Sequence, residues 1–354
     1  MCVGILEVVN GLADAQDATS TVVIVGISRG GEASGRPTRE WRDLAGSRRG
    51  SVSRLRLEPA VAADAAAVTE VVVALESSLY GQTAFSQADL EDEWSEFDLK
   101  QDARVVRDGD RIVGFGAVRD LGALWRAEGY VHPDALGRGI GKLIASGLEQ
   151  DAARRGARRI QNGVFEADSP ARRLLESLGY GAVRVFRELR IELGAPPLVP
   201  QWPDGLHVVA FDPERDALAF HAAHQEAFAD HWDHTPRDFA SWSKSHLGSE
   251  RFDPALWCVV RAGDEIAAGT ICTGDTYGGG WVHALFTCRA WRKQGVGAAL
   301  LGDAFGRFWG RGERGVGLGV DAASDTGAFR LYQRGGMAPV LGWVIYEKAL
   351  GDAG

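Results

Sequence analysis

Two glycine-rich runs in the sequence have residue types that suit a phosphate ligand. They are WRKQGVGAALL at residues 291–301 and LGRGIGKLIAS at residues 136–146, and each continues into good helix formers. The start of a helix leaves about four backbone N–H groups without internal partners and carries partial positive charge. Glycines let an anion approach those groups closely, and Arg292 and Lys293 add mobile positive charge. Both runs therefore predict a site for a phosphate or pyrophosphate group.

The spacing in these runs does not fit the two most familiar nucleotide motifs. A dinucleotide-binding fingerprint needs a third glycine three residues after the second, but Leu300 and Ile144 occupy those positions. A Walker loop needs Ser or Thr after Gly-Lys, but Leu143 follows Lys142. The alternative is a turn that only tightens a strand-to-helix connection, and the repetition of the run favours ligand binding over that alternative.

The elements around the two runs recur in the same order. A strand, a helical stretch and a hairpin precede each run, and a helix, a strand, another helix and a closing strand follow it. Three pairs of matching glycines lie 154, 156 and 157 residues apart: Gly109 and Gly263, Gly139 and Gly295, and Gly179 and Gly336. This agreement predicts an internal duplication into two domain-sized halves.

The composition sets the predicted domain boundaries. Residues 1–52 are rich in Gly, Ser and Arg toward their end and are expected to form a mostly disordered extension. The N-terminal half is residues 53–193 and the C-terminal half is residues 205–350, and the proline-rich stretch at residues 194–204 reads as a linker between them.

The net charge, the cysteines and the apolar stretches of the sequence exclude several classes of protein. The net charge is −9 without a long basic run, which argues against nucleic acid as a partner. The four cysteines form no Cys-x-x-Cys pair, so neither a metal site nor a disulfide framework is expected. No apolar stretch reaches the roughly 18 residues of a membrane span. We expect a cytoplasmic globular protein, either a monomer or a homodimer.

The residues RKQGVG fit the Arg/Gln-x-x-Gly-x-Gly/Ala loop of GCN5-related N-acetyltransferases, the GNAT superfamily. VHPDALGRGIG in the N-terminal half resembles the same pattern but has Leu136 where Arg or Gln is usual. GLGVDAASDTGAFRLYQRGGM is similar to mycothiol synthase and related tandem acetyltransferases. The resemblance covers about 300 residues of both halves. It implies an α/β fold in each half: a mixed, mostly antiparallel sheet, flanked by helices, that splays between its fourth and fifth strands.

In this family, acyl-CoA lies in the opening of the sheet, and acetyl-CoA is the expected cofactor here. The resemblance implies that loop amides hold the pyrophosphate and that the pantetheine pairs with the preceding strand. In the C-terminal half, the implied cofactor residues are Leu285, Phe286, Thr287, Arg292, Lys293, Gln294, Gly295, Val296, Gly297, Ala298 and Asp325. In the N-terminal half they are Val131, Gly137, Arg138, Gly139, Ile140, Gly141 and Lys142.

Two residues are candidates for proton transfer. In the family a tyrosine on the helix after strand five protonates the leaving thiolate, and Tyr332 matches that position. Leu175 stands at the matching position of the N-terminal half and cannot donate a proton, so the C-terminal half is the predicted catalyst and the N-terminal half a degenerate copy. If WVHALFT is a regular strand, His283 shares a face with Leu285 and Thr287, and it could take the proton of the amine.

Alternatives remain for these assignments. Tyr332 could be a core tyrosine and His283 a structural histidine. Mycothiol synthase carries a glutamate seven residues before the position that matches Thr287, whereas this chain has Gly280 there. The acceptor pocket is expected around residues 227–242, but these could instead form a loop packed by its own tryptophans; the candidate acceptor residues are His231, Trp232 and His234.

The sequence thus predicts an acyl-CoA-dependent N-acyltransferase, most simply an N-acetyltransferase, that acts on a primary amine of a small molecule. One alternative is a mycothiol-synthase-like acetyltransferase. The other is a protein that binds acyl-CoA without catalysis, which the lack of an obvious carboxylate base favours and which the presence of Tyr332 disfavours.

Overall fold

The computed structural model describes residues 55–351 apart from residues 82, 84, 96, 123, 233, 235, 250, 277, 278 and 325. The expected extension at residues 1–52 and the candidate cofactor residue Asp325 lie outside the described residues.

The N-terminal half alternates short strands with helices. Ser86 begins α3 with a reciprocal capping box, in which its hydroxyl accepts from Asp89 N and the Asp89 carboxylate accepts from Ser86 N. Asp168 caps α6 by accepting from Ala171 N, and a proline occupies the first turn. The elements are β1 (Arg56–Pro59), α2 (Ala65–Tyr80), α3 (Gln87–Trp94), α4 (Leu99–Asp102), β2 (Ala103–Asp108), β3 (Arg111–Asp120), β4 (Trp125–Val131), α5 (Ile140–Arg154), β5 (Arg159–Phe165), α6 (Ser169–Ser177) and β6 (Gly181–Glu192).

The C-terminal half repeats this order. Asp212 and Asp238 cap the two helices that precede its hairpin, each by accepting from backbone N–H groups of the first turn. The elements are β7 (Leu206–Ala210), α7 (Pro213–Phe228), α8 (Phe239–His246), β8 (Cys258–Ala262), β9 (Glu265–Thr276), β10 (Gly279–Thr287), α9 (Val296–Gly310), β11 (Gly315–Asp321), α10 (Ala328–Arg334) and β12 (Ala338–Ala349). Within the described residues, no helix is both long and apolar enough to cross a membrane.

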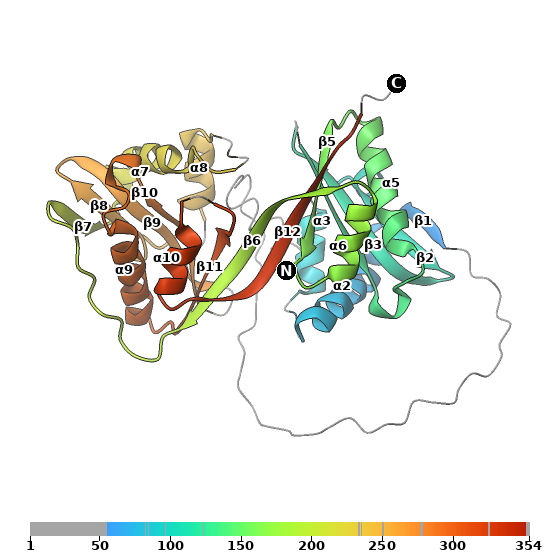
Figure 1. Ribbon diagram of the computed structural model, residues 1–354, viewed down its shortest axis with the longest axis horizontal. Coiled ribbons are helices and arrows are strands. Elements are labelled where there is room, and N and C mark those ends of the chain that lie inside the picture. The colour runs from blue at the N-terminus through green and yellow to red at the C-terminus, as the bar shows by residue number, and fades with distance from the viewer. Residues whose placement is uncertain are drawn as a thin grey trace, which may run out of the picture.

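The halves exchange their last strands. The described strands form one sheet in the order β1-β2-β3-β4-β5-β12-β6-β11-β10-β9-β8-β7. Thus β6, at the end of the N-terminal half, pairs with β11, while β12, at the end of the chain, pairs with β5. The two exchanged strands pair with each other and cross between the halves (Figure 1). The order of elements along the sequence does not reveal this exchange, and the domain boundaries stay a prediction.

In both halves, the sheet opens after a short parallel pairing. In the N-terminal half, β4 and β5 pair from Trp125 to Ala127, and in the C-terminal half, β10 and β11 pair from Gly280 to Val282. The later residues of β10 and β11 do not pair with each other, so the strands diverge. Helix α5 packs on β3 and β4, and α9 packs on β9 and β10. This mixed, splayed sheet with flanking helices confirms the predicted fold class.

Large aromatic side chains fill the core of the C-terminal half. Trp242, Trp257, Phe220 and Phe308 are almost completely buried, and burial of each such side chain is worth about 1.5–3 kcal/mol. Cys272 accepts from the indole of Trp257 through its carbonyl oxygen at 2.9 Å, which satisfies the polar atom of that ring. This core holds the helices against the sheet and so fixes the walls of the opening between β10 and β11.

Candidate active site

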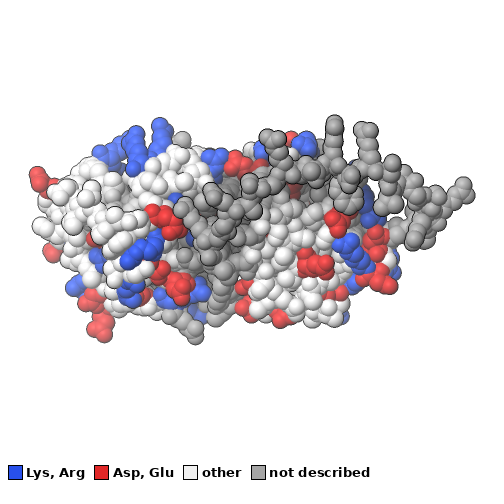
Figure 2. All heavy atoms as spheres, turned by 90° about the horizontal axis from the view of Figure 1, so that it is seen from below, with Lys and Arg blue, Asp and Glu red and all other residues white. Residues whose placement is uncertain are grey.

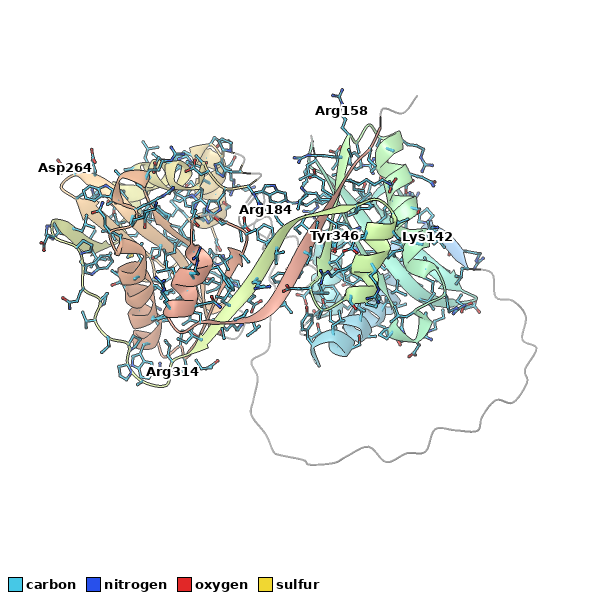
Figure 3. All side chains as sticks on the ribbon, viewed as in Figure 1. Lys142, Arg158, Arg184, Asp264, Arg314 and Tyr346 are labelled. Carbon is cyan, nitrogen blue, oxygen red and sulfur yellow. The ribbon has the colours of Figure 1, made fainter. Side chains whose placement is uncertain are left out.

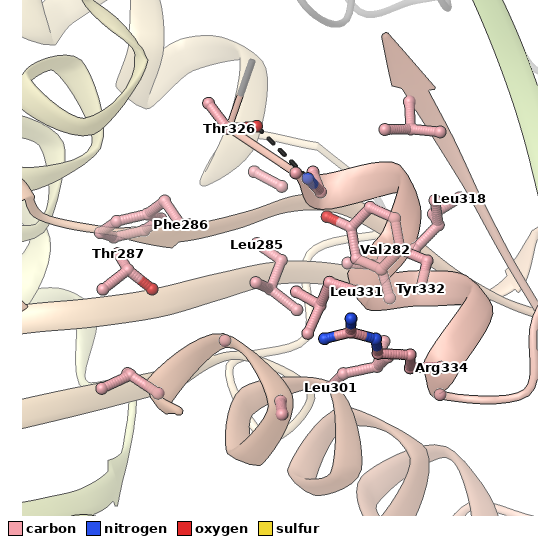
Figure 4. Close-up of a pocket in the computed structure, with 18 of the residues that line it drawn as sticks. Val282, Leu285, Phe286, Thr287, Leu301, Leu318, Thr326, Leu331, Tyr332 and Arg334 are labelled. Carbon is pink, nitrogen blue, oxygen red and sulfur yellow. Dashed lines mark hydrogen bonds between the residues drawn. The ribbon is translucent and has the colours of Figure 1, made fainter. Parts of the chain in front are cut away.

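A cavity of about 1240 Å³ occupies the opening between β10 and β11. Its walls come from both strands, the start of α9, the helix α10, the segment after α7 and part of β6. Figure 4 shows Val282, Leu285, Leu318, Leu331 and Tyr332 around this space. The cavity therefore brings together the glycine-rich loop and both predicted proton-transfer residues, since Gly295, His283 and Tyr332 all line it.

The glycine-rich loop turns sharply into α9. Gly295 is the residue before the helix, with a φ of +88°, and no side chain caps the free N–H groups. Lys293 also has a positive φ of 62°, which is uncommon for a residue other than glycine. Its counterpart in the N-terminal half is Gly137, and Gly137 and Gly139 have φ values of 77° and 81°. Both loops thus share one backbone shape, and in the C-terminal half the uncapped helix start faces the cavity.

Arg292 is anchored rather than mobile. Its Nε donates to Thr287 O at 3.1 Å, its Nη2 donates to Ala227 O at 2.8 Å, and its Nη1 lies 3.3 Å from Asp230 Oδ2. Gln294 likewise donates to the carbonyl oxygen of a neighbouring residue of the loop. The expectation that Arg292 supplies mobile positive charge is therefore wrong, because the side chain ties the end of β10 to the end of α7. Lys293 stays exposed at the cavity.

His283 lies at a β-bulge, not in a regular strand. Val282 is opposite Cys272, but Ala284 is opposite Ile271, so His283 is the extra residue of β10. The predicted alternation of faces through His283 is therefore wrong. The imidazole is exposed to solvent and lines the cavity, and its Nε2 lies 2.8 Å from Thr273 Oγ1. Protein atoms around the cavity wall, and then the charge of Arg251, lower the pKa of His283 below its usual value even though the ring itself is exposed, which favours the neutral ring.

Tyr332 combines burial with a free hydroxyl. Its side chain is 7% exposed and points from α10 into the cavity (Figure 4). Burial raises the pKa of Tyr332 well above its usual range, so the phenol keeps its proton near pH 7. In the described part of the chain, no residue forms a hydrogen bond with its Oη. The hydroxyl is therefore available to donate to a group bound in the cavity.

The predicted acceptor residues divide into two sets. His231 and Trp232 line the cavity, whereas His234 lies outside its wall. The His231 ring packs on Phe228 with their centroids 4.4 Å apart. Burial, and to a lesser extent the nearby charges of His234 and Arg292, lower the pKa of His231 to about 4.

The sequence analysis missed several charged residues of the cavity, which are Arg184, Glu192, Asp230, Asp321 and Arg334. Arg184 lies on the exchanged strand β6, and Asp321 ends β11. Their closest charged atoms, Arg184 Nε and Asp321 Oδ2, are 3.7 Å apart. Arg184 belongs to the N-terminal half by number, so only the exchange of strands reveals its place in the C-terminal cavity.

The N-terminal half keeps the loop but differs around it. Strand β4 pairs with β3 in a continuous register without a bulge. Leu136 is 49% exposed, and Arg138 forms an ion pair of 2.7 Å with Asp108 instead of facing a ligand. Leu175 is buried in the core. The two glycine-rich loops are thus alike in backbone shape, while among the described residues the bulge and the tyrosine on the helix after the fifth strand are found in the C-terminal half.

Glu128 is a further buried group of the N-terminal half that the sequence analysis missed. It is 3% exposed, and its Oε2 accepts from Tyr130 Oη at 3.1 Å. Burial, reinforced by the nearby Glu93, raises the pKa of the Glu128 carboxyl well above its usual range.

The family model of the Acetyltransferase (GNAT) family matches the sequence at residues 71–180 and again at residues 217–337. The chain belongs to this family and carries one copy in each half. A GNAT chain of this kind is an N-acetyltransferase, and the two copies make it a tandem GNAT protein, as the glycine-rich runs predicted.

The sequence is similar to curated mycothiol acetyltransferases. A mycothiol acetyltransferase of Thermobispora bispora is 30% identical over 263 residues, which cover 69% of this chain and 82% of that protein. Another, of Streptomyces scabiei, is 29% identical and covers 68% of this chain and 76% of that protein.

Solved structures agree in fold. A GCN5-related N-acetyltransferase from Sphaerobacter thermophilus is 32% identical and covers 83% of this chain and 95% of that chain, with a TM-score of 0.73. A tandem GNAT protein from the clavulanic acid biosynthesis pathway is 17% identical, covers 85% of this chain and 100% of that chain, and has a TM-score of 0.62, which shows a shared fold.

Proposed function

We propose that the C-terminal half transfers an acetyl group from acetyl-CoA to a primary amine of a small molecule. The observation that carries this proposal is a single cavity in which an uncapped helix start, the bulge at His283 and the free hydroxyl of Tyr332 meet. Acetyl-CoA would supply the acyl group and a thiolate leaving group.

The residues of the cavity fit this cofactor. The backbone N–H groups of Gly295, Val296 and Gly297 suit a pyrophosphate, because no side chain caps that helix start, whereas the Ala298 N–H already donates to Gly295 O at 3.1 Å. Lys293 adds an exposed positive charge beside them. The residues Leu285 to Thr287 lie where β10 has separated from β11, so one edge of the strand is open to the amides of a pantetheine arm.

Two groups suit the proton transfers of amide formation. The neutral imidazole of His283 can accept the proton of the attacking amine, directly or through water, because it is exposed to the cavity. The Tyr332 hydroxyl can donate a proton to the leaving thiolate, because burial keeps it protonated. The bulge leaves the backbone of His283 outside the regular strand ladder, where it can interact with a bound group.

A mycothiol-type acceptor is the second candidate, favoured by the relatives of Thermobispora bispora and Streptomyces scabiei. One feature disfavours it. At Gly280, which takes the place of the glutamate in mycothiol synthase, an added Cβ would lie 2.3 Å from the Phe308 ring. The structure therefore has no room for a side chain there.

The test is to incubate the full chain with acetyl-CoA and a panel of primary amines and to measure CoA release and the acetylated product. We expect turnover with at least one amine. Binding of acetyl-CoA without turnover on any amine would support the non-catalytic alternative, and absence of binding would refute the assignment of the cavity.

A further inference from the structure

Arg184 reaches the C-terminal cavity from the N-terminal half. It lies near the start of β6, where it is opposite Ile345 of β12 in the sheet. The next residue, Val185, accepts through its carbonyl oxygen from Ala322 N at 2.8 Å, which fixes β6 beside the end of β11. Figure 3 shows Arg184 between the two halves. Its position is therefore set by backbone pairing on both sides rather than by a loop.

The guanidinium of Arg184 is held in place without being hydrogen-bonded. Its carbon lies 5.5 Å from the centroid of the Trp232 ring, a cation–π contact. Its Nε is buried, and the nearest carboxylate oxygen, on Asp321, is 3.7 Å away, which is beyond hydrogen-bond distance. In the described part of the chain, no residue accepts a hydrogen bond from this guanidinium. The Arg184 side chain is 30% exposed, so its Nη groups, which have no acceptor among the described residues, suit an added acceptor group better than the buried Nε does.

The other cations of the cavity lie elsewhere. Arg292 is already held by Ala227 O and Asp230. Lys293 belongs to the glycine-rich loop, and Arg334 lies on α10 beside Leu301 and Leu331 (Figure 4). Lys293 and Arg334 suit the phosphates of the donor. Arg184 instead shares its part of the wall with Trp232, on the segment that follows α7. The surface as a whole does not attract anions. The net charge is −9, and acidic and basic side chains are mixed on the face that Figure 2 shows.

We propose that the amine acceptor carries a carboxylate that binds to Arg184, so that the substrate is an amino acid or a peptide-like amine. This inference rests on the proposed function. A guanidinium can bind both oxygens of a carboxylate through parallel N–H donors. Asp321 already offsets part of the charge of Arg184, so a singly charged carboxylate fits better than a doubly charged phosphate. Trp232 contributes an apolar ring for the side chain of the acceptor, and it packs 6.2 Å from Phe186, centroid to centroid.

The first experiment compares amines that differ only in this charge. The probes are phenylalanine, histidine and lysine, each with its primary amide, and CoA release gives kcat and KM for the full chain. In the wild type we expect a lower KM for each acid than for its amide. Arg184→Gln should raise the KM of the acids roughly tenfold to 100-fold and leave that of the amides unchanged, because a charge-assisted pair is lost.

Matched variants control for folding. Arg187→Gln removes another arginine of β6, one that pairs with Glu166 and packs over Phe329 outside the cavity, and should leave the preference for acids intact. Arg184→Lys keeps the positive charge but loses the planar fork of N–H donors, so it should raise the KM of the acids less than Arg184→Gln does. The thermal midpoint of each variant verifies that it is folded.

A binding measurement separates this inference from the proposed function. Calorimetric titration of the acids and amides into the protein saturated with CoA needs no turnover. Tighter binding of an acid than of its amide, abolished by Arg184→Gln, would support the role of Arg184 even if no amine were acetylated. Equal affinity of acid and amide in the wild type, or binding of neither, would overturn it, even if a carboxylate-free amine were acetylated.

Discussion

Substitution of Tyr332 by phenylalanine tests whether the buried phenol transfers a proton. The change keeps the ring, which is 7% exposed, and removes only the hydroxyl. Because that hydroxyl forms no hydrogen bond with a described residue, its loss leaves no orphaned partner, and the stability should change by less than about 1 kcal/mol. A general acid typically accelerates a reaction about 10²–10⁴-fold, equivalent to about 2.7–5.4 kcal/mol in the activation free energy. We therefore expect kcat to fall in that range.

The assay follows CoA release at saturating amine and acetyl-CoA, together with KM for the amine, acetyl-CoA affinity and the thermal midpoint. A group that acts mainly in the transition state lowers kcat with little effect on KM or on affinity. The raised pKa of Tyr332 also predicts that the phenol is not titrated below about pH 10, so no alkaline loss of activity should come from this group in that range.

Tyr346→Phe is the matched control. Tyr346 is fully buried on β12, and its hydroxyl donates to Glu176 Oε1 at 2.8 Å. Arg172 Nε also donates to this hydroxyl at 3.3 Å, so the variant loses two hydrogen bonds and should lose about 1–3 kcal/mol of stability, while kcat should be unchanged. If instead Tyr332→Phe retains kcat within about threefold of the wild type while chemistry is shown to be rate-limiting, Tyr332 is a packing residue and the reasoning about the general acid fails.

Three further predictions concern the loop, the histidine and the exchanged strands. Gly295→Val should weaken acetyl-CoA binding more than tenfold, as measured by calorimetry, and should remove turnover. Gly139→Val imposes similar backbone strain, at a φ of 81°, but should leave most turnover intact. An inactive Gly139→Val enzyme would show that the catalytic half has been misassigned. The pKa of His283 is lowered below its unfolded value, which favours the neutral ring in the folded protein. With the amine at saturation, so that ionisation of the free amine does not set the profile, kcat should show no acid limb from His283 near pH 6.5. An acid limb that persists unchanged in His283→Gln would exclude His283 as the base. Because each half lends a strand to the other, neither residues 53–193 nor residues 205–350 should unfold cooperatively when expressed alone, whereas a mixture of the two fragments should show cooperative unfolding. A sharp thermal transition by circular dichroism in either fragment alone would contradict this prediction.

Local patterns and their repetition predicted the order of the elements and the duplication, whereas the splayed mixed sheet was implied by the family resemblance. Hydrophobic alternation, turn residues and matching glycines gave the order of the elements and the duplication. The position of each glycine-rich loop directly before a helix start was also predictable, and phosphate binding there stays a prediction. The assignment of individual cofactor and catalytic residues stays a prediction.

Three features of the site could not be predicted because they depend on pairing at a distance. A bulge adds one residue to one strand, and nothing in WVHALFT marks His283 as that residue. Arg292 looked like a free cation, because its partners Ala227 and Asp230 lie more than 60 residues away. The place of Arg184 in the cavity could not be predicted either, because no local sequence pattern shows that β6 pairs with β11.

The exchange of strands gives the N-terminal half a structural role in the C-terminal half, although it has Leu175 at the position of Tyr332. Leu189 of β6 is fully buried in the core of the C-terminal half, and Trp343 and Ile345 of β12 are buried in the core of the N-terminal half. Each such side chain is worth about 1.5–3 kcal/mol, and a whole domain is stable by only about 5–15 kcal/mol. Loss of either exchanged strand would therefore remove a large part of the stability of the other half. The strand that supplies this core contact also carries Arg184, so the N-terminal half contributes to the C-terminal cavity whether or not it binds a cofactor of its own.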